Sequence, residues 1–147
     1  MAMKILLIDD DSDDRLLFCE AIEEIAPDTT CVTEQNAGKA LADLNNKAIA
    51  LPDVIFVDIN MPSIDGWECL DKIKSNDATK GIPVIMFSTS SAEMDIERAA
   101  HSGAVSLLTK PDNFVELKKI LLDIITSLSN KLPLNILQLT IIHAEVA

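Results

Sequence analysis

Basic residues are scarce in this chain of 147 residues, in which 12 Lys and Arg stand against 24 Asp and Glu and the net charge is −12. Binding to nucleic acids or to anionic membranes depends on Lys and Arg side chains that neutralise phosphates. The charge balance therefore argues against both kinds of partner. It suits cations or basic surfaces of other proteins.

Long hydrophobic runs are also missing. The first residues, Met-Ala-Met-Lys, lead directly into a strand pattern without the apolar core of a signal peptide, and no apolar run approaches the length of about 20 residues that crosses a bilayer. Three cysteines, Cys19, Cys31 and Cys69, lie within apolar patterns without CxxC spacing. We interpret them as small buried hydrophobic residues in a reducing compartment, and we expect a cytoplasmic protein.

Short apolar segments alternate with helical patterns along the chain. The strand patterns cover residues 4–8, 29–33, 54–57, 82–87 and 105–108. Helical stripes of apolar residues follow each of them, with Leu17, Ala21, Ile22 and Ile25 in the first. Five strand–helix repeats require parallel strands joined by right-handed crossovers. We therefore predict one α/β domain over residues 1–130, with a five-stranded, doubly wound parallel sheet.

Polar residues end four of these strands. Asp9 and Asp10 follow the first strand, Asp58 the third, Ser88 the fourth and Lys110 the fifth. In a parallel sheet these ends lie along one edge, so the side chains converge. Clustered carboxylates repel one another, and a hard cation such as Mg²⁺ relieves the repulsion. Phosphoryl transfer to Asp58, with Lys110 and Ser88 facing the phosphate, is the simplest chemistry for this set.

Each signal also has an ordinary structural explanation. Residues 9–14 can be a solvated acidic loop that caps a helix, Ser88 can end a strand, and Lys110 can be a surface charge. The acidic segment also nearly matches a calcium loop, but Asp14 occupies the position that requires glycine, and a strand precedes the segment. The alignment of all these residues with strand ends favours the phosphoryl-transfer hypothesis.

The chain closely resembles the receiver domain of two-component response regulators over roughly residues 3–129. The resemblance rests on four motifs in order: Leu-Leu-Ile-Asp-Asp-Asp, Phe-Val-Asp-Ile-Asn-Met-Pro-Ser-Ile-Asp-Gly, Pro-Val-Ile-Met-Phe-Ser and Thr-Lys-Pro. It implies a flavodoxin-like (βα)5 fold and a stand-alone, CheY-like module without a separate output domain. Such a module is a signalling domain that catalyses only its own phosphorylation and dephosphorylation.

The resemblance also implies roles for single residues. Asp58 corresponds to the phosphoacceptor. Asp9 and Asp10 would bind Mg²⁺ or Mn²⁺ together with Asp58, and the backbone carbonyl of Asn60 would complete the protein ligands. Asn60 and Ser90 match positions that tune the rate of dephosphorylation in the family.

The same resemblance implies a conformational switch. Ser88 would reorient toward the acyl phosphate, Lys110 would pair with it, and the bond between Lys110 and Pro111 would be cis. The switch position in the fifth strand, usually Tyr or Phe, is Leu107 here, and the chain contains no Tyr. We therefore expect changes on phosphorylation to centre on residues 88–92 and the helix that follows.

In this interpretation a sensor histidine kinase or a histidine phosphotransfer protein supplies the phosphoryl group. Output would pass by protein contact across the fourth helix, the fifth strand and the fifth helix. A haloacid-dehalogenase-type phosphohydrolase is one alternative, since Asp9-x-Asp11 suits it. The order of the motifs and the lack of a cap insertion argue against it. A pseudo-receiver that is never phosphorylated is the other alternative. The presence of all the site residues argues against it.

Residues 131–147 follow the predicted domain and are strongly apolar. Their periodicity fits a strand or a helix, and Pro133 disfavours a helix before it. A segment this apolar covers some surface, because large exposed apolar patches mark interfaces. We hypothesise that it packs on its own domain or, as a dimerisation arm, on a second copy; an appended sequence unrelated to the domain is the alternative.

Overall fold

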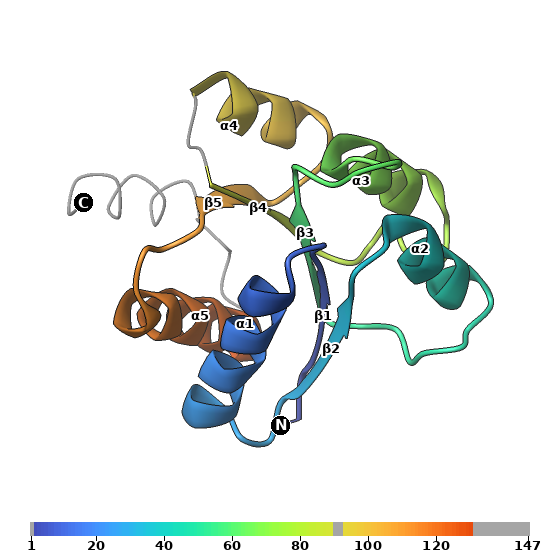
Figure 1. Cartoon of the computed structure of the whole chain (residues 1–147). Coiled ribbons are helices and arrows are strands. Elements are labelled where there is room, and N and C mark those ends of the chain that lie inside the picture. Colours follow the sequence, from blue (N-terminus) through green and yellow to red (C-terminus); the bar gives the residue numbers. More distant parts are fainter. Residues whose placement is uncertain (1, 90–92, 131–147) are drawn as a thin grey trace.

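The computed structural model describes residues 2–89 and 93–130. Five parallel strands form one sheet in the order β2-β1-β3-β4-β5, with a helix after each strand (Figure 1). In chain order the elements are β1 (Lys4–Ile8), α1 (Ser12–Ile25), β2 (Thr30–Glu34), α2 (Ala37–Asn45), β3 (Val54–Asp58), α3 (Gly66–Ser75), β4 (Val84–Ser88), α4 (Glu93–His101), β5 (Ser106–Thr109) and α5 (Phe114–Ser129). The predicted five-stranded parallel α/β sheet is confirmed.

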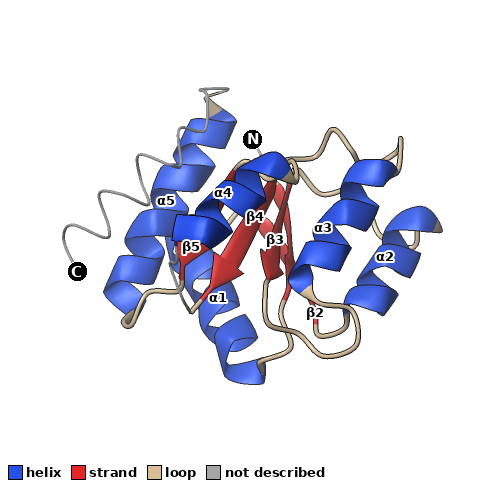
Figure 2. Ribbon diagram, turned by 90° about the horizontal axis from the view of Figure 1, so that it is seen from above, coloured by secondary structure: helices blue, strands red, loops and turns tan. Residues whose placement is uncertain are grey.

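The helices cover both faces of the sheet. Helices α1 and α5 lie on one face, and α2, α3 and α4 lie on the other (Figures 1 and 2). Every residue of β3 and of β4 is buried, as continuous apolar runs in the centre of a parallel sheet require. Side chains alternate between the faces, so that Ile5 and Leu7 pack toward α1 and α5 while Leu6 and Ile8 pack toward the other helices.

The two faces are filled with different side chains. On the α1/α5 side, the rings of Phe18, Phe56 and Phe87 meet edge to face with centroids 5.0 to 6.2 Å apart. We call this side the aromatic face. The buried residues of the other side are aliphatic or sulfur-containing, such as Met86 and Leu107, and we call it the aliphatic face.

Polar side chains begin most of the helices. The Asp11 carboxylate accepts hydrogen bonds from the backbone N–H groups of Asp13 and Asp14 and so caps α1. Asn36, Asp65 and Asn113 cap α2, α3 and α5 in the same way. The helix-capping explanation of the acidic segment therefore holds for Asp11, whereas Asp9 and Asp10 come before the cap.

Two packing expectations were wrong. Leu17 is 43% exposed, and the neighbouring Phe18 is buried in its place, because the inward stripe of α1 is set by the packing against β3 and α5. Cys19 and Cys31 are only half-buried, because they lie between α1 and the edge strand β2, while Cys69 is buried as predicted.

Across the described residues, we find no helix with the length and hydropathy needed to span a membrane.

Candidate functional site

Three carboxylates meet at the carboxyl end of the sheet. Asp9 follows β1 and Asp58 ends β3, and these two strands are hydrogen-bonded neighbours. Asp9 is 0% and Asp58 5% exposed, whereas Asp10 is exposed. One ligand oxygen from each of the three side chains lies within 4.8 Å of the others. The fold thus brings together the acids that the sequence placed in one site.

Lys110 inserts its ammonium among these acids. Its Nζ lies 2.8 Å from Asp9 Oδ2 and 3.7 Å from Asp58 Oδ2. It also donates a hydrogen bond of 2.7 Å to Asp14 Oδ2 on the first turns of α1. Asp14 was missed from the sequence, where it counted only as the residue that spoils a calcium loop. Asp14 lies four residues before the buried Phe18, on the same side of α1, but nothing in the sequence alone pointed to Lys110.

The loop after β3 packs its backbone closely against the end of that strand. The N–H of Asn60 donates a hydrogen bond of 3.2 Å to Asp58 Oδ1, and the N–H of Gly66 donates one of 3.0 Å to the carbonyl of Ile59. A Cβ atom at Gly66 would collide with the carbonyl oxygen of Asp58 and the Cα of Ile59. Only glycine fits at the start of α3 without moving the backbone that carries Asp58.

Ser88 ends β4, the strand that pairs with β3, and Leu107 lies one strand further away, on β5. Both are 1% exposed, and Leu107 is opposite Met86 in the pairing of β4 with β5. The N–H of Lys110 donates a hydrogen bond of 2.6 Å to the carbonyl of Ser88, which ties the ends of β4 and β5 together. Ser90 lies outside the described residues.

The expected cis bond is not present. None of the peptide bonds that the structure describes is cis, so the Lys110–Pro111 bond is trans. The two forms of a bond before proline differ by only about 0.5–1 kcal/mol, so local packing decides between them. Lys110 reaches Asp9 and Asp14 with the trans bond.

The surroundings of Asp58 favour its protonated form. Burial and the nearby charge of Asp9 raise the pKa of Asp58 to about 7, although the Lys110 ammonium and the N–H of Asn60 act in the opposite direction. Burial alone would lower the pKa of Lys110, but its hydrogen bond to Asp14, its ion pair with Asp9 and the charge of Asp58 raise that pKa above its ordinary value. One lysine therefore leaves the negative charge of the carboxylates incompletely balanced.

The donor set fits a hard divalent cation. Asp9 Oδ1 accepts the N–H of Asp11 at 2.9 Å, while the buried Asp9 Oδ2 has the ion pair with Lys110 but no hydrogen bond from any described group. All the ligand atoms at hand are carboxylate or carbonyl oxygens, which Mg²⁺ and Mn²⁺ prefer. A cation would relieve the repulsion that raises the pKa of Asp58.

Residues 5–122 match the family model described as the response regulator receiver domain. The chain belongs to this family. Receiver structures share its flavodoxin-like arrangement of five parallel strands and five helices. The cyanobacterial phytochrome response regulator RcpA, solved in phosphorylated form, is 32% identical, covers 89% of this chain and 96% of its own, and superposes with a TM-score of 0.80.

Two further relatives extend the comparison. The Mn²⁺-bound form of the response regulator Rcp1 is 30% identical, has a TM-score of 0.74, and covers 83% of this receiver and 91% of its own chain. The probable methanogenesis regulatory protein FilR2 of Methanothrix harundinacea is 31% identical over 119 residues, which are 78% of this receiver and 76% of FilR2. The receiver therefore matches these relatives over most of their length.

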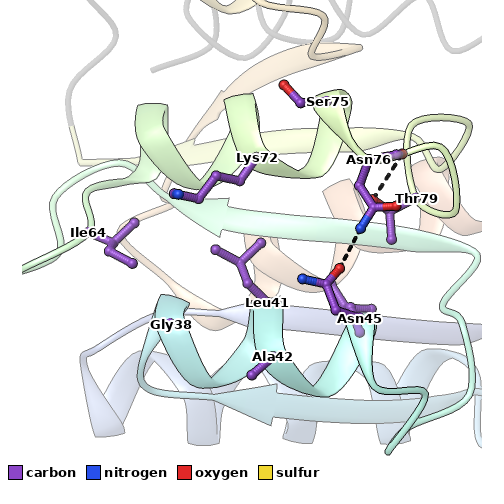
Figure 3. Close-up of a pocket in the computed structure, with 10 residues that line it drawn as sticks. Gly38, Leu41, Ala42, Asn45, Ile64, Lys72, Ser75, Asn76 and Thr79 are labelled. Carbon is purple, nitrogen blue, oxygen red and sulfur yellow. Dashed lines mark hydrogen bonds between the residues drawn. The ribbon is translucent and has the colours of Figure 1, made fainter.

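A groove on the surface lies away from the acidic side chains. It is a groove of about 640 Å³ between α2 and α3, where Leu41 and Ile64 supply apolar walls and the Asn76 amide donates to the side-chain oxygen of Asn45 (Figure 3). Among the described residues no carboxylate lines it, and Lys72 supplies a positive charge. The clustered carboxylates lie at the sheet edge and not in this groove.

Proposed function

We propose that this receiver accepts a phosphoryl group on Asp58 and signals through contact with other proteins. One observation carries the proposal: a buried carboxylate at the end of β3 has two further acids and an ammonium around it. The likeness to RcpA, which has been solved in phosphorylated form, supports it.

In the proposed reaction the donor is a phosphohistidine on a sensor histidine kinase or a histidine phosphotransfer protein. A carboxylate oxygen of Asp58 forms the new bond to phosphorus, the bond between phosphorus and the donor imidazole nitrogen breaks, and its electron pair stays on that nitrogen. Asp58 must be ionised to attack. Its pKa of about 7 means that a positive charge at the site increases the reactive fraction at neutral pH.

Asp9, Asp10 and Asp58 would hold Mg²⁺ or Mn²⁺ together with the carbonyl of Asn60. The bound ion would supply neutralisation of charge on the phosphoryl oxygens. The Mn²⁺-bound form of Rcp1 supports this assignment. Lys110 would pair with the phosphorylated Asp58. It would then give up part of its present contact with Asp9 and Asp14.

Ser88 would donate a hydrogen bond to the phosphoryl group, and Asn60 and Ser90 would tune its loss by hydrolysis. Because Leu107 cannot supply a rotating ring, the response would concentrate in residues 88–92 and α4. The α4–β5–α5 surface would carry the signal to a downstream protein. Cytoplasmic location is part of the same proposal, since such kinases and targets meet there.

Asp58→Asn tests the acceptor. Incubate the protein with acetyl phosphate and Mg²⁺, and follow it by Phos-tag mobility and intact mass. The wild type should gain one phosphoryl group and Asp58→Asn none. Asp71→Asn, which removes an exposed carboxylate on α3, is the matched control and should behave as the wild type.

Other results would identify the alternatives. A phosphorylated Asp58→Asn protein would place the acceptor elsewhere. A wild type that takes up no phosphate and no Mg²⁺ would be a pseudo-receiver. Sustained turnover of a small phosphate ester would indicate a haloacid-dehalogenase-type hydrolase.

We further propose that residues 1–130 form the receiver and that residues 131–147, which lie outside the described residues, contact a second copy. Their apolar composition supports the proposal. Light scattering should give a dimer for the full chain and a monomer for a chain that ends at Asn130. Equal monomeric masses at tens of micromolar would contradict a dimerisation arm.

A further inference from the structure

Two thiols meet between α1 and β2. Cys19 Sγ on α1 donates a hydrogen bond to Cys31 Sγ on β2 across 3.1 Å. Both residues are half-buried, and Cys31 packs against the core of the aromatic face. Cys69, the remaining cysteine, is fully buried on the aliphatic face. The sequence offered no reason to pair Cys19 with Cys31, because their spacing matches no motif.

We propose that Cys19 and Cys31 form a reversible oxidation site that closes to a disulfide on reaction with a low-molecular-weight disulfide such as oxidised glutathione. Cys19 attacks one sulfur of the glutathione disulfide, and the first glutathione leaves with the proton of Cys19. Cys31 then attacks the Cys19 sulfur, and the second glutathione leaves with the proton of Cys31. One glutathione disulfide is reduced to two thiols, and the protein dithiol is oxidised to one disulfide.

The geometry favours this site over ordinary core cysteines. The two sulfurs are in contact, so closing the bond requires an approach of about 1 Å toward the usual S–S length. Partial exposure gives a small disulfide access to the pair. Burial, followed by the hydrogen bond with Cys19, raises the pKa of Cys31, so Cys19 should be the thiol that attacks first and the attack by Cys31 the slower step.

The bond would join two elements that lead to the acidic edge. Helix α1 begins directly after the aspartates, and the carbonyl of Glu34 at the end of β2 accepts the N–H of Asp9 at 3.0 Å. Both elements would become fixed to each other about half-way along α1. Because the new bond removes conformational entropy from the unfolded chain, we expect the oxidised protein to unfold at a temperature several degrees higher than the reduced one.

The test equilibrates the whole chain with glutathione buffers that range from reduced to oxidised, then traps free thiols with iodoacetamide. Cys19 and Cys31 fall in one tryptic peptide, residues 16–39, because Arg15 and Lys39 bound it. The expected result is loss of two hydrogen atoms from this peptide and no alkylation of it. Cleavage after Glu20, Glu23 or Glu24 should leave two pieces that separate only on reduction.

Single serine variants provide the controls. Cys69→Ser should oxidise as the wild type does, while Cys19→Ser and Cys31→Ser should lose the cross-link and the rise in unfolding temperature. Two free thiols in peptide 16–39 in the most oxidising buffer would overturn the proposal. So would a stable glutathione adduct without the internal bond, or a disulfide between two chains. These readouts do not depend on phosphorylation, so this proposal and the proposed function can fail separately.

Discussion

Helices α5 and α4, which lie on the aromatic and the aliphatic face of the sheet, are held very differently. On the aromatic face, α5 alone buries Leu117, Ile120, Leu121, Ile124 and Ile125. On the aliphatic face, α4 buries only Ala99. Elements with few buried apolar contacts open at a lower free energy. Helix α5 is therefore firmly anchored on the aromatic face, while α4, on the side of Leu107, should be the helix that is most easily moved.

The strongest test of this comparison is Phe56→Ala. The Phe56 side chain is 0% exposed, and its ring contacts those of Phe18 and Phe87. We expect the free energy of unfolding to fall by about 3–5 kcal/mol, because a large cavity opens in the anchoring face. Urea denaturation measures the loss. Val115→Ala on the exposed side of α5 is the control, with a change within about 0.5 kcal/mol; a loss of similar size in both variants would contradict the comparison.

Leu107→Phe tests whether the aliphatic face has room for an aromatic ring at this position. Leu107 is 1% exposed and packed within that face, so the added volume should cost about 1–3 kcal/mol of stability. Leu107→Met, which nearly conserves volume, should cost less. If Leu107→Phe leaves urea denaturation unchanged, the aliphatic face is more adaptable than its burial indicates.

Asp58 lies at the edge that both faces share, and its titration should be visible in stability. Its pKa is about 7 in the folded protein against an ordinary value of 3.8, so the folded state holds the proton more tightly. The contribution of Asp58 to the free energy of unfolding is therefore fully present below a pH of about 4 and is lost as the pH rises through about 7.

Asp58→Asn should therefore need more urea to unfold than the wild type at pH 8. Its free energy of unfolding should be higher by about 1–2 kcal/mol after allowance for solvent screening, and the two proteins should differ little at pH 4. Lys110 keeps its closer partners, Asp9 and Asp14, in this variant. Saturating Mg²⁺ should narrow the gap, because it stabilises the ionised wild type. A gap that does not change with pH would show that Asp58 is ionised throughout.

The smallest expected effect concerns the attachment of α4. The Arg98 guanidinium lies over the Trp67 ring, 4.4 Å from its centroid, and so links α4 to α3. Arg98→Met should cost about 0.5–1 kcal/mol and speed amide exchange in α4. On α5, Lys118 Nζ lies 4.9 Å from the centroid of the Phe114 ring. Lys118→Met removes this similar contact and should leave amide exchange in α5 unchanged. Equal responses in both helices would mean that α4 is as firmly anchored as α5.

The sequence predicted the sheet well because its signals are local. Apolar runs such as those of β3 and β4, followed by polar residues, specify buried parallel strands and the edge at which Asp9, Asp58 and Lys110 meet. Strand bounds shifted by one or two residues, as for β4, which begins at Val84 and includes Ser88.

Side-chain partners could not be predicted in the same way. The contact of Asp14 with Lys110 spans 96 positions in the sequence, and the contact of Cys19 with Cys31 joins a helix to an edge strand. Both contacts depend on how α1 is rotated about its axis against the sheet. The exposure of Leu17 shows that the spacing of apolar residues in α1 did not predict this rotation. The sequence likewise did not predict the trans bond between Lys110 and Pro111.

Gly66 leaves no space between the start of α3 and the peptide that follows Asp58, because the two stretches of backbone lie in direct contact. A displacement of the Asp58 backbone would therefore push α3 directly, since no side chain lies between them that could change its rotamer. Any larger residue at position 66 would act as a permanent wedge under Asp58 and would move its carboxylate away from Asp9 and Lys110.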